Sequence, residues 1–451
     1  MTDANTFKVR CFGDNSAIVD GTGLASFDCT AEPAGEHWRA IHRPLPSDML
    51  SVAAAVWLAD RACSRRSGMN RKDARFAWAR EILLDVEVHE PERWNTVAPA
   101  LAKLLHFLTD DAWTLRFEAK TRQRPIVELP LLEPENVSAV CLFSGGLDST
   151  LGLHRHASQV AGTLAPVPIT RNGVERGRLK EGPLAALAQE GHGLTDVHTW
   201  LQGAASNSAS SLNVEKSQRS RGVVFLLNIA AVALAAEKTC AYVYEPGVGA
   251  FNPSMSDAQV GAFNTRAMHP GVFDAFESIV SVLSGSEFRI EAPHILQTKG
   301  ELCGLDVAAT MRLAPVAVSC DRGVGHRADW KTHCGKCTSC LLRRASMYAA
   351  VGSADPTTYL FHGDALLATP ELRVFTKLGE ALAKCRTFDD LVYHDHAIEA
   401  ALPYFAKRGM SGLDTERQIV NMMRRYAAEI AAWTEFANGP VAHSRALEAA
   451  C

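Results

Sequence analysis

The sequence lacks the features that mark several classes of protein. Its longest apolar run, Val223 to Ala236, is interrupted by Asn228 and is too short to cross a bilayer. Its first ten residues, MTDANTFKVR, contain no apolar segment of the signal-peptide type. We therefore expect a cytoplasmic protein that does not enter a membrane.

Charge of one sign is not in excess either. The chain has 46 Lys and Arg against 50 Asp and Glu, which gives a formal net charge of −4. This balance disfavours broad electrostatic binding to nucleic acid. Internal repeats and long low-complexity tracts are also missing, which excludes solenoids, propellers and disordered tails.

What is present is a globular composition with room for two to three domains. The 451 residues are 47% hydrophobic and 21% charged. Residues 1–135 contain the strand-like pieces FKVRCFG, LLDVEVH and WTLRFEA and helical stretches at 47–63 and 94–108, which predict an α+β module. The proline-containing segment 129–138 marks a boundary, and residues 353–451 have helical periodicity.

Residues 136–352 alternate strand and helix. The expected strands are 139–143, 197–201, 241–244 and 288–291, and the expected helices are 148–156, 221–238 and one beginning at Lys299. This order predicts a doubly wound α/β domain with a parallel sheet, whose ligands bind at the carboxyl ends of the strands.

The first of these strands runs directly into a Ser-Gly-Gly turn and then a helix. The residues concerned are Phe143, Ser144, Gly145, Gly146, Leu147, Asp148, Ser149, Thr150 and Leu151. Adjacent glycines can aim successive N–H groups at one point, and the helix N-terminus adds positive potential, so the turn predicts an anion cradle. Asp148 could cap the helix or hold Mg²⁺. Neither a Walker loop nor the GxGxxG pattern is present. The alternative to an anion cradle is a plain strand-to-helix turn.

Four of the twelve cysteines form a second signal. Eight are scattered, whereas Cys320, Cys334, Cys337 and Cys340 fall in one stretch that includes CGKCTSC. Two-residue gaps suit a tetrahedral, structural Zn²⁺ site with Cys320 as the fourth ligand. His326, His333 or Cys303 are alternative fourth ligands, and an iron–sulfur cluster is the alternative to zinc.

The SGGLDS segment resembles the fingerprint of the PP-loop ATP pyrophosphatases, which cleave ATP to AMP and pyrophosphate. Together with CGKCTSCLLR, in which Arg343 matches the arginine of the motif, it resembles the QueC-like 7-cyano-7-deazaguanine synthases. Ser220-Arg221-Gly222 and Thr298-Lys299-Gly300-Glu301 resemble two further segments of that family. The resemblance implies ATP, Mg²⁺ and Zn²⁺ as cofactors and Ser144, Asp148, Ser149, Arg221 and Lys299 as the catalytic residues.

The resemblance covers about residues 137–352, and the chain departs from the family outside it. The segment EPGVGAFNPSM, Glu245 to Met255, replaces an acidic substrate loop, and its glycines and prolines predict an open wall. Glu245 is a candidate purine or acid/base contact. With its added regions the chain resembles the QueC-like proteins of bacterial anti-phage operons, in particular the QatC proteins of the Qat system.

We therefore expect an ATP-dependent C–N ligase that adenylates a 7-carboxy-7-deazaguanine-like carboxylate. The acceptor would be ammonia or an amine of an operon partner protein, in a defence system. Two alternatives stay open. A PP-loop tRNA-modifying enzyme would use basic clusters such as Lys216, Arg219 and Arg221. A non-catalytic ATP-binding scaffold subunit would bind the nucleotide without cleaving it.

Overall fold

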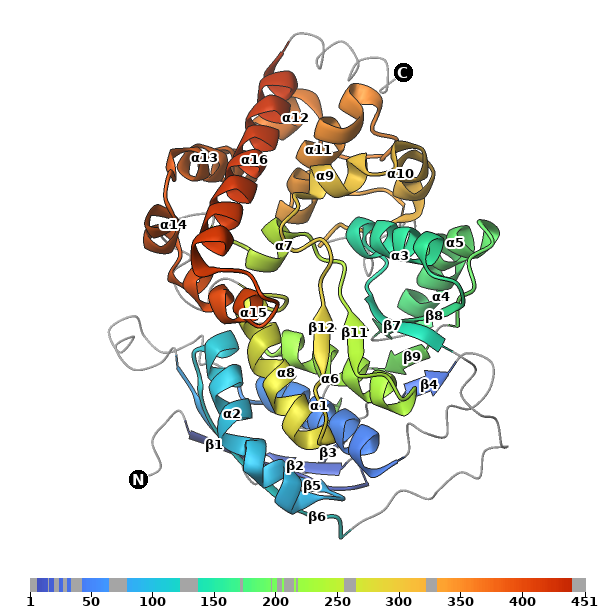
Figure 1. The fold of residues 1–451 in the computed structure, drawn as a ribbon, viewed down its shortest axis with the longest axis vertical. Coiled ribbons are helices and arrows are strands. Elements are labelled where there is room, and N and C mark those ends of the chain that lie inside the picture. The colour runs from blue at the N-terminus through green and yellow to red at the C-terminus, as the bar shows by residue number, and fades with distance from the viewer. Residues whose placement is uncertain are drawn as a thin grey trace.

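The computed structural model describes residues 6–14, 16–19, 24–26, 31–33, 43–64, 79–121, 137–170, 173–195, 197–200, 205–206, 215, 218–254, 265–321 and 331–439. These residues form two six-stranded sheets covered by helices (Figure 1). The N-terminal sheet lies at one end of the molecule, the C-terminal helices lie at the other, and the second sheet lies between them.

The N-terminal sheet has the order β10-β3-β2-β1-β5-β6. Its strands are β1 (Thr6–Cys11), β2 (Ser16–Val19), β3 (Leu24–Ser26), β5 (Glu81–Val88), β6 (Ala112–Ala119) and β10 (Ala205–Ser206). Helices α1 (Pro44–Ala62) and α2 (Pro91–Thr109) accompany it, and α2 buries Trp94, Leu101, Leu105 and Leu108 at helical spacing. The three strands and two helices expected in this region are confirmed.

The second sheet has the order β12-β11-β7-β8-β9-β4. Its strands are β4 (Ala31–Pro33), β7 (Val137–Phe143), β8 (Thr163–Thr170), β9 (Val197–Trp200), β11 (Cys240–Tyr242) and β12 (Arg289–Glu291). All neighbours pair in parallel except β4, which is antiparallel to β9. The expected parallel α/β sheet is therefore present.

Strand β8 was not among the expected strands. It contains Pro166 and Pro168, and proline is rare inside central strands. The structure shows how they are accommodated. Both prolines lie opposite β7, whereas β8 pairs with β9 only through Ile169 and Thr170, beyond them.

From Ala139 onward, alternate residues of β7 pack into different cores, as expected for a strand covered on both faces. Val140 joins the larger core, which includes α6 (Arg221–Ala235), and so does Val137, which a shift in register separates from Ala139. Ala139, Cys141 and Phe143 join a second core formed with α3 (Leu147–Gln159).

The regions assigned from the sequence are interlocked. Strand β4, from the N-terminal region, pairs with β9, and β10, from the middle region, pairs with β3. The larger core runs from α1 and α2 through α6 to the C-terminal helices. The boundaries at 135 and 352 stay predictions, and most of the proposed linker lies outside the described residues.

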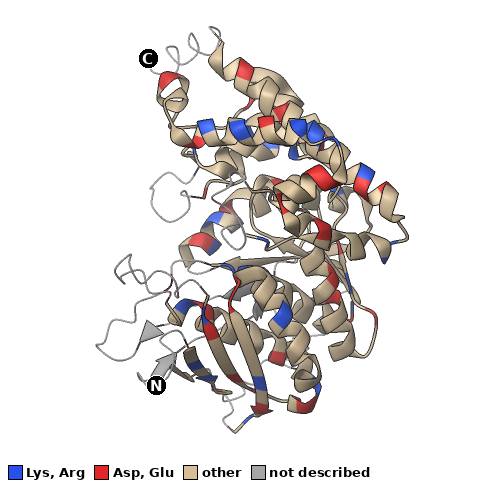
Figure 2. Ribbon diagram, turned by 90° about the vertical axis from the view of Figure 1, so that its left-hand side faces the viewer, with Lys and Arg blue, Asp and Glu red and all other residues tan. Residues whose placement is uncertain are grey.

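The remaining helices are α4 (Gly173–Leu179), η3 (Lys180–Leu184), α5 (Ala185–Gln189), α7 (Gly247–Phe251), α8 (Pro270–Ser284), α9 (Lys299–Gly304), α10 (Val307–Leu313), η6 (Ala314–Val316), α11 (Thr338–Val351), η7 (Gly352–Ala354), α12 (Gly363–Leu367), α13 (Pro370–Lys384), α14 (Phe388–His394), η8 (His396–Ala401), α15 (Leu402–Ala406) and α16 (Gly412–Asn438). None of the helices in the described part of the chain has the length and hydropathy needed to cross a bilayer. In the view of Figure 2 basic and acidic positions are interspersed along the ribbon.

Candidate functional site

The Ser-Gly-Gly turn lies at the point where the second sheet reverses its strand order. Strand β7 has β8 on one side and β11 on the other, and the turn joins the end of β7 to the start of α3. Ligands of open α/β sheets bind in the crevice at such a point. The first N–H groups of α3 have no carbonyl partner within their own helix, so the first turn, apart from the Leu147 N–H that donates to Ser319 Oγ, can donate to an anion.

Gly145 is required by the shape of the turn. Its φ is +72°, in the left-handed region, and a Cβ added there would lie 2.1 Å from Leu179 Cδ2. The two neighbouring serines meet over the turn: Ser144 Oγ lies 3.1 Å from Ser149 Oγ, and Ser149 Oγ donates to the carbonyl of Gly146. Ser144 is exposed and Ser149 is buried, so Ser144 presents the more accessible hydroxyl.

Asp148, in the first turn of α3, forms an ion pair with Lys299 at the start of α9. Lys299 Nζ lies 2.8 Å from Asp148 Oδ2, and both side chains are almost fully buried. Burial by itself lowers the pKa of Lys299, but the carboxylates of Asp148 and Glu245 outweigh it and raise that pKa above its usual value. Lys299 is therefore a fixed positive charge at the turn.

Asp148 has a further property that suits a cation. Its Oδ1 is buried and accepts no hydrogen bond from any described residue. A carboxylate oxygen left without a partner is the type of ligand that Mg²⁺ prefers. The side chain thus fits a magnesium ion beside a bound phosphate.

Glu245 follows β11 and belongs to the same group of charges. Burial, and then the charge of Asp148, raise the pKa of Glu245 to about 7, and Lys299 only partly offsets this. A carboxylate with such a pKa can take up or release a proton near neutral pH.

Several other residues expected at the site have buried or distant side chains. Phe143, Leu147 and Leu151 are core residues, and Thr150 Oγ1 donates to the carbonyl of Gly146, so these four can reach a ligand only through their backbone. Arg221 is exposed, its guanidinium lies 5.5 Å from the Phe225 ring centroid, and Nη1 donates to Gln218. These contacts of Arg221 do not involve the turn, and its role stays a prediction.

The expectation of an open wall at Glu245 to Met255 is wrong for the part that the structure describes. Residues 247–251 form α7, in which Gly247, Val248, Ala250 and Phe251 are buried. A Cβ on Gly247 would lie 2.1 Å from the carbonyl oxygen of Ile295 and 2.9 Å from Met422 Cε. The glycine therefore serves close packing rather than openness, and Met255 lies outside the described residues.

The four clustered cysteines converge as the spacing predicted. Cys320, Cys334, Cys337 and Cys340 are buried, and their Sγ atoms all lie within 4.8 Å of one another. The Sγ atoms of Cys334 and Cys340 are 3.8 Å apart, and two thiolates on a tetrahedral Zn²⁺ lie about 3.8 Å apart. The backbone N–H of Cys337 donates to Cys334 Sγ. The group could hold one zinc ion, and its compactness does not suit a multi-iron cluster.

The alternative fourth ligands lie elsewhere or outside the described residues. His333 Nε2 accepts the N–H of Ser319, Cys303 belongs to the core beside α3, and His326 is not described.

The cysteine group is connected to the turn by a segment that sequence reasoning missed. Ser319, next to Cys320, accepts hydrogen bonds from the Leu147 N–H at 3.2 Å and from Arg343 Nη1 at 3.3 Å. The N–H of Val318 donates to the Gly145 carbonyl. Arg343 is fully buried and also donates to the carbonyls of Ala314 and Ala317. The cysteine group thus holds the segment that supports the turn.

These features define a class: an α/β protein with a Ser-Gly-Gly turn at the switch point of a parallel sheet, backed by a buried four-cysteine group. The chain is 35% identical over 96 residues to the 7-cyano-7-deazaguanine synthases of Cupriavidus taiwanensis and Cupriavidus necator. The match spans 20% of this chain and 39% of each relative, well below two thirds of their length. No family model matches the chain, and no solved structure matches it.

Proposed function

We propose that the chain is an ATP-dependent C–N ligase of the QueC-like PP-loop class. The observation that carries the proposal is the Asp148–Lys299 pair beside the Ser-Gly-Gly turn, at the carboxyl edge of the parallel sheet. The partial similarity of the chain to two 7-cyano-7-deazaguanine synthases points to the same chemistry.

The proposed reaction has two steps. A carboxylate oxygen of a 7-carboxy-7-deazaguanine-like substrate attacks the α-phosphorus of ATP, and pyrophosphate leaves with the bonding electrons. The nitrogen of an amine then attacks the acyl carbon of the acyl-adenylate, and AMP leaves. Adenylation is needed because a carboxylate at neutral pH has no good leaving group.

The residues of the turn have distinct tasks in this scheme. The N–H groups of the turn and the Ser144 hydroxyl would donate to the phosphates, and Lys299 would offset the charge that develops on pyrophosphate. Asp148 would hold Mg²⁺, which supplies electrostatic stabilisation of the phosphates. Glu245, with its pKa of about 7, would accept the proton that the attacking amine loses.

The zinc proposed at the four cysteines has a structural task. It would fix residues 318–320, and through Ser319 and Val318 the turn itself.

The acceptor is part of the proposal. We propose either ammonia or an amine of an operon partner protein, with the chain acting as a QatC-type component of an anti-phage system. The N-terminal sheet and the C-terminal helices would supply surface for such a partner.

One experiment tests the proposal. The protein is incubated with ATP, Mg²⁺ and 7-carboxy-7-deazaguanine, with and without ammonium or the partner protein, and AMP, small products and intact protein masses are measured. AMP that depends on the carboxylate supports the ligase. AMP that forms only with tRNA would indicate a tRNA-modifying enzyme, and ATP that binds without cleavage would indicate a scaffold subunit.

The same measurement separates the acceptors. A deazapurine-sized mass increase on the partner would identify a protein amine, whereas a free amide or nitrile with unchanged partner masses would identify ammonia.

A further inference from the structure

Two histidines and a glutamate converge at a place that the proposed reaction does not use. His154 lies on α3, two turns beyond Asp148, and Glu190 and His192 lie in the turn after α5. His154 Nδ1 is 3.1 Å from His192 Nε2 and 2.6 Å from Glu190 Oε2, and His192 Nε2 is 3.5 Å from the same oxygen. The three side chains are only 12% to 19% exposed.

The hydrogen bond between the His154 and His192 rings accounts for only part of this arrangement. Glu190 Oε2 is buried and accepts no hydrogen bond from the described residues, although both rings approach it. Two imidazole nitrogens and one carboxylate oxygen bound to a Zn²⁺-sized ion lie about 3.0 to 3.4 Å from one another. The observed separations of 2.6 to 3.5 Å bracket that range. We propose that His154, Glu190 and His192 form a second metal site, for a divalent transition-metal ion of the Zn²⁺ or Co²⁺ type.

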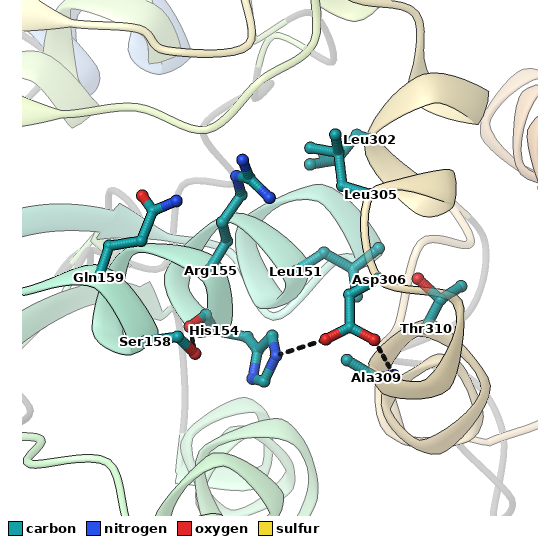
Figure 3. A pocket seen from close by; sticks show the side chains of 10 residues that line it. All are labelled: Leu151, His154, Arg155, Ser158, Gln159, Leu302, Leu305, Asp306, Ala309 and Thr310. Carbon is teal, nitrogen blue, oxygen red and sulfur yellow. Dashed lines mark hydrogen bonds and ion pairs between the residues drawn. The ribbon is translucent and has the colours of Figure 1, made fainter.

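Groups around two of the three ligands orient them as the outer partners of metal ligands do. Arg312, on α10, donates to Glu190 Oε1 through Nε at 3.1 Å and Nη2 at 3.0 Å, which leaves Oε2 for the ion. His154 Nε2 lies 3.5 Å from Asp306 Oδ2, as the dashed line in Figure 3 shows. That carboxylate favours a proton on Nε2 and therefore a free lone pair on Nδ1.

The ligand set also determines which ions are suitable. Two imidazoles suit zinc, cobalt and nickel, whereas Mg²⁺ and Ca²⁺ prefer oxygen ligands throughout. Three protein ligands leave at least one coordination position for water. A cavity of about 140 Å³ lies beside His154, between α3 and α9–α10, and it is too small for a nucleotide (Figure 3).

The ion would join two parts of the chain that meet at the Ser-Gly-Gly turn. Helix α3 begins there, and the segment ending at Glu190 and His192 also carries Leu179, which packs against Gly145. Binding would therefore hold residues 173–192 against α3 and stabilise the folded state by mass action.

The test uses the full-length protein after equilibration with a weak chelator, so that only tightly bound zinc, expected at the four cysteines, remains. Zn²⁺ is then titrated by competition with a chromophoric chelator, in wild type, His192→Ala, Glu190→Gln and the control His396→Ala, whose histidine is exposed on η8. Thermal unfolding with and without added Zn²⁺ is measured on the same samples.

Wild type and His396→Ala should bind one more Zn²⁺ per chain than the other two variants and should unfold at a higher temperature when Zn²⁺ is added. Co²⁺ at this site should give ligand-field bands without a new thiolate charge-transfer band, and Mg²⁺ should not compete. The proposal is overturned if wild type binds no additional Zn²⁺, or if Glu190→Gln and His192→Ala still bind it.

A crystal soaked in Zn²⁺ gives an independent measurement. An anomalous peak bounded by His154 Nδ1, Glu190 Oε2 and His192 Nε2 supports the site, and a soaked crystal with a peak only at the cysteines refutes it. Neither measurement depends on ATP cleavage, so the result is independent of the proposed ligase activity.

Discussion

Lys299 Nζ lies 2.8 Å from Asp148 Oδ2, so the first residue of α9 pairs with the first turn of α3 beside the Ser-Gly-Gly turn. The pair is buried, and its two partners are far apart in the sequence. This contact assembles one candidate site from two motifs, and it gives the most direct test of that site.

Asp148→Asn and Lys299→Met should each lower AMP formation by roughly 100-fold or more, because the first removes the carboxylate proposed to hold Mg²⁺ and the second removes the positive charge proposed to face the phosphates. The matched control is Asp274→Asn, which alters a carboxylate on α8 that pairs with Lys407 and lies outside the candidate site. AMP formation at the wild-type rate in a folded Asp148→Asn protein would contradict the site assignment.

The four-cysteine group should hold one zinc ion per chain that a weak chelator does not remove. Cys337→Ser should lose this zinc and become poorly soluble, because the proposed ion would hold residues 318–320 in place. Cys385→Ser changes a buried thiol outside the group and should retain the zinc. Metal content by mass spectrometry checks both variants, and a brown protein would indicate iron and sulfur instead.

Ser319→Ala should lower kcat by roughly 10-fold to 100-fold while the thiolate-bound zinc is retained, since Ser319 positions the turn without touching the metal. Ser278→Ala, on the distant helix α8, is the control. The KM for ATP and the zinc content separate a positioning role from general unfolding. Equal kcat in wild type and Ser319→Ala would show that the turn does not need this support.

Glu429, on α16, should make stability depend on pH. Burial raises the pKa of Glu429 to about 7, Glu301 adds to this, and hydrogen bonds from Thr298 and Gly300 and the charge of Arg425 oppose it. The folded state therefore binds more protons than the unfolded state between about pH 4.5 and pH 7, so this group makes the free energy of unfolding fall as pH rises through that range.

Glu429→Gln removes the titrating proton, so the variant should show a smaller fall in stability across the same range. Chemical denaturation at several pH values measures the difference from wild type. An identical pH dependence in the two proteins would show that Glu429 titrates at its ordinary pKa.

Asp111→Ala should destabilise the protein by about 3–5 kcal/mol, because it leaves a buried charge without one of its partners. Arg80 Nη2 lies 2.6 Å from both Asp60 and Asp111, and Asp60 also accepts a hydrogen bond from Ser220 of the middle region. The control Glu118→Ala breaks an exposed pair with Arg10 and should cost about 1 kcal/mol or less. Similar midpoints of denaturation for the two variants would contradict this prediction.

The sequence determined the parts of this protein that depend on neighbouring residues. A buried strand followed by Ser-Gly-Gly and a helix predicted the turn, because glycine conformation and helix termini are local properties. Cysteines at two-residue gaps predicted the convergence of Cys334, Cys337 and Cys340 for the same reason. The alternation of strands and helices indicated the parallel sheet.

Only the tertiary structure decided how these parts meet. The support of the turn by Ser319, the pairing of β4 with β9 and the packing of α7 against Ile295 all join residues that are distant in the sequence. The convergence of His154 with Glu190 and His192 belongs to the same group. Such contacts form only when whole helices and strands pack together. The shapes and buried surfaces that decide this packing cannot be read from any short stretch of the sequence.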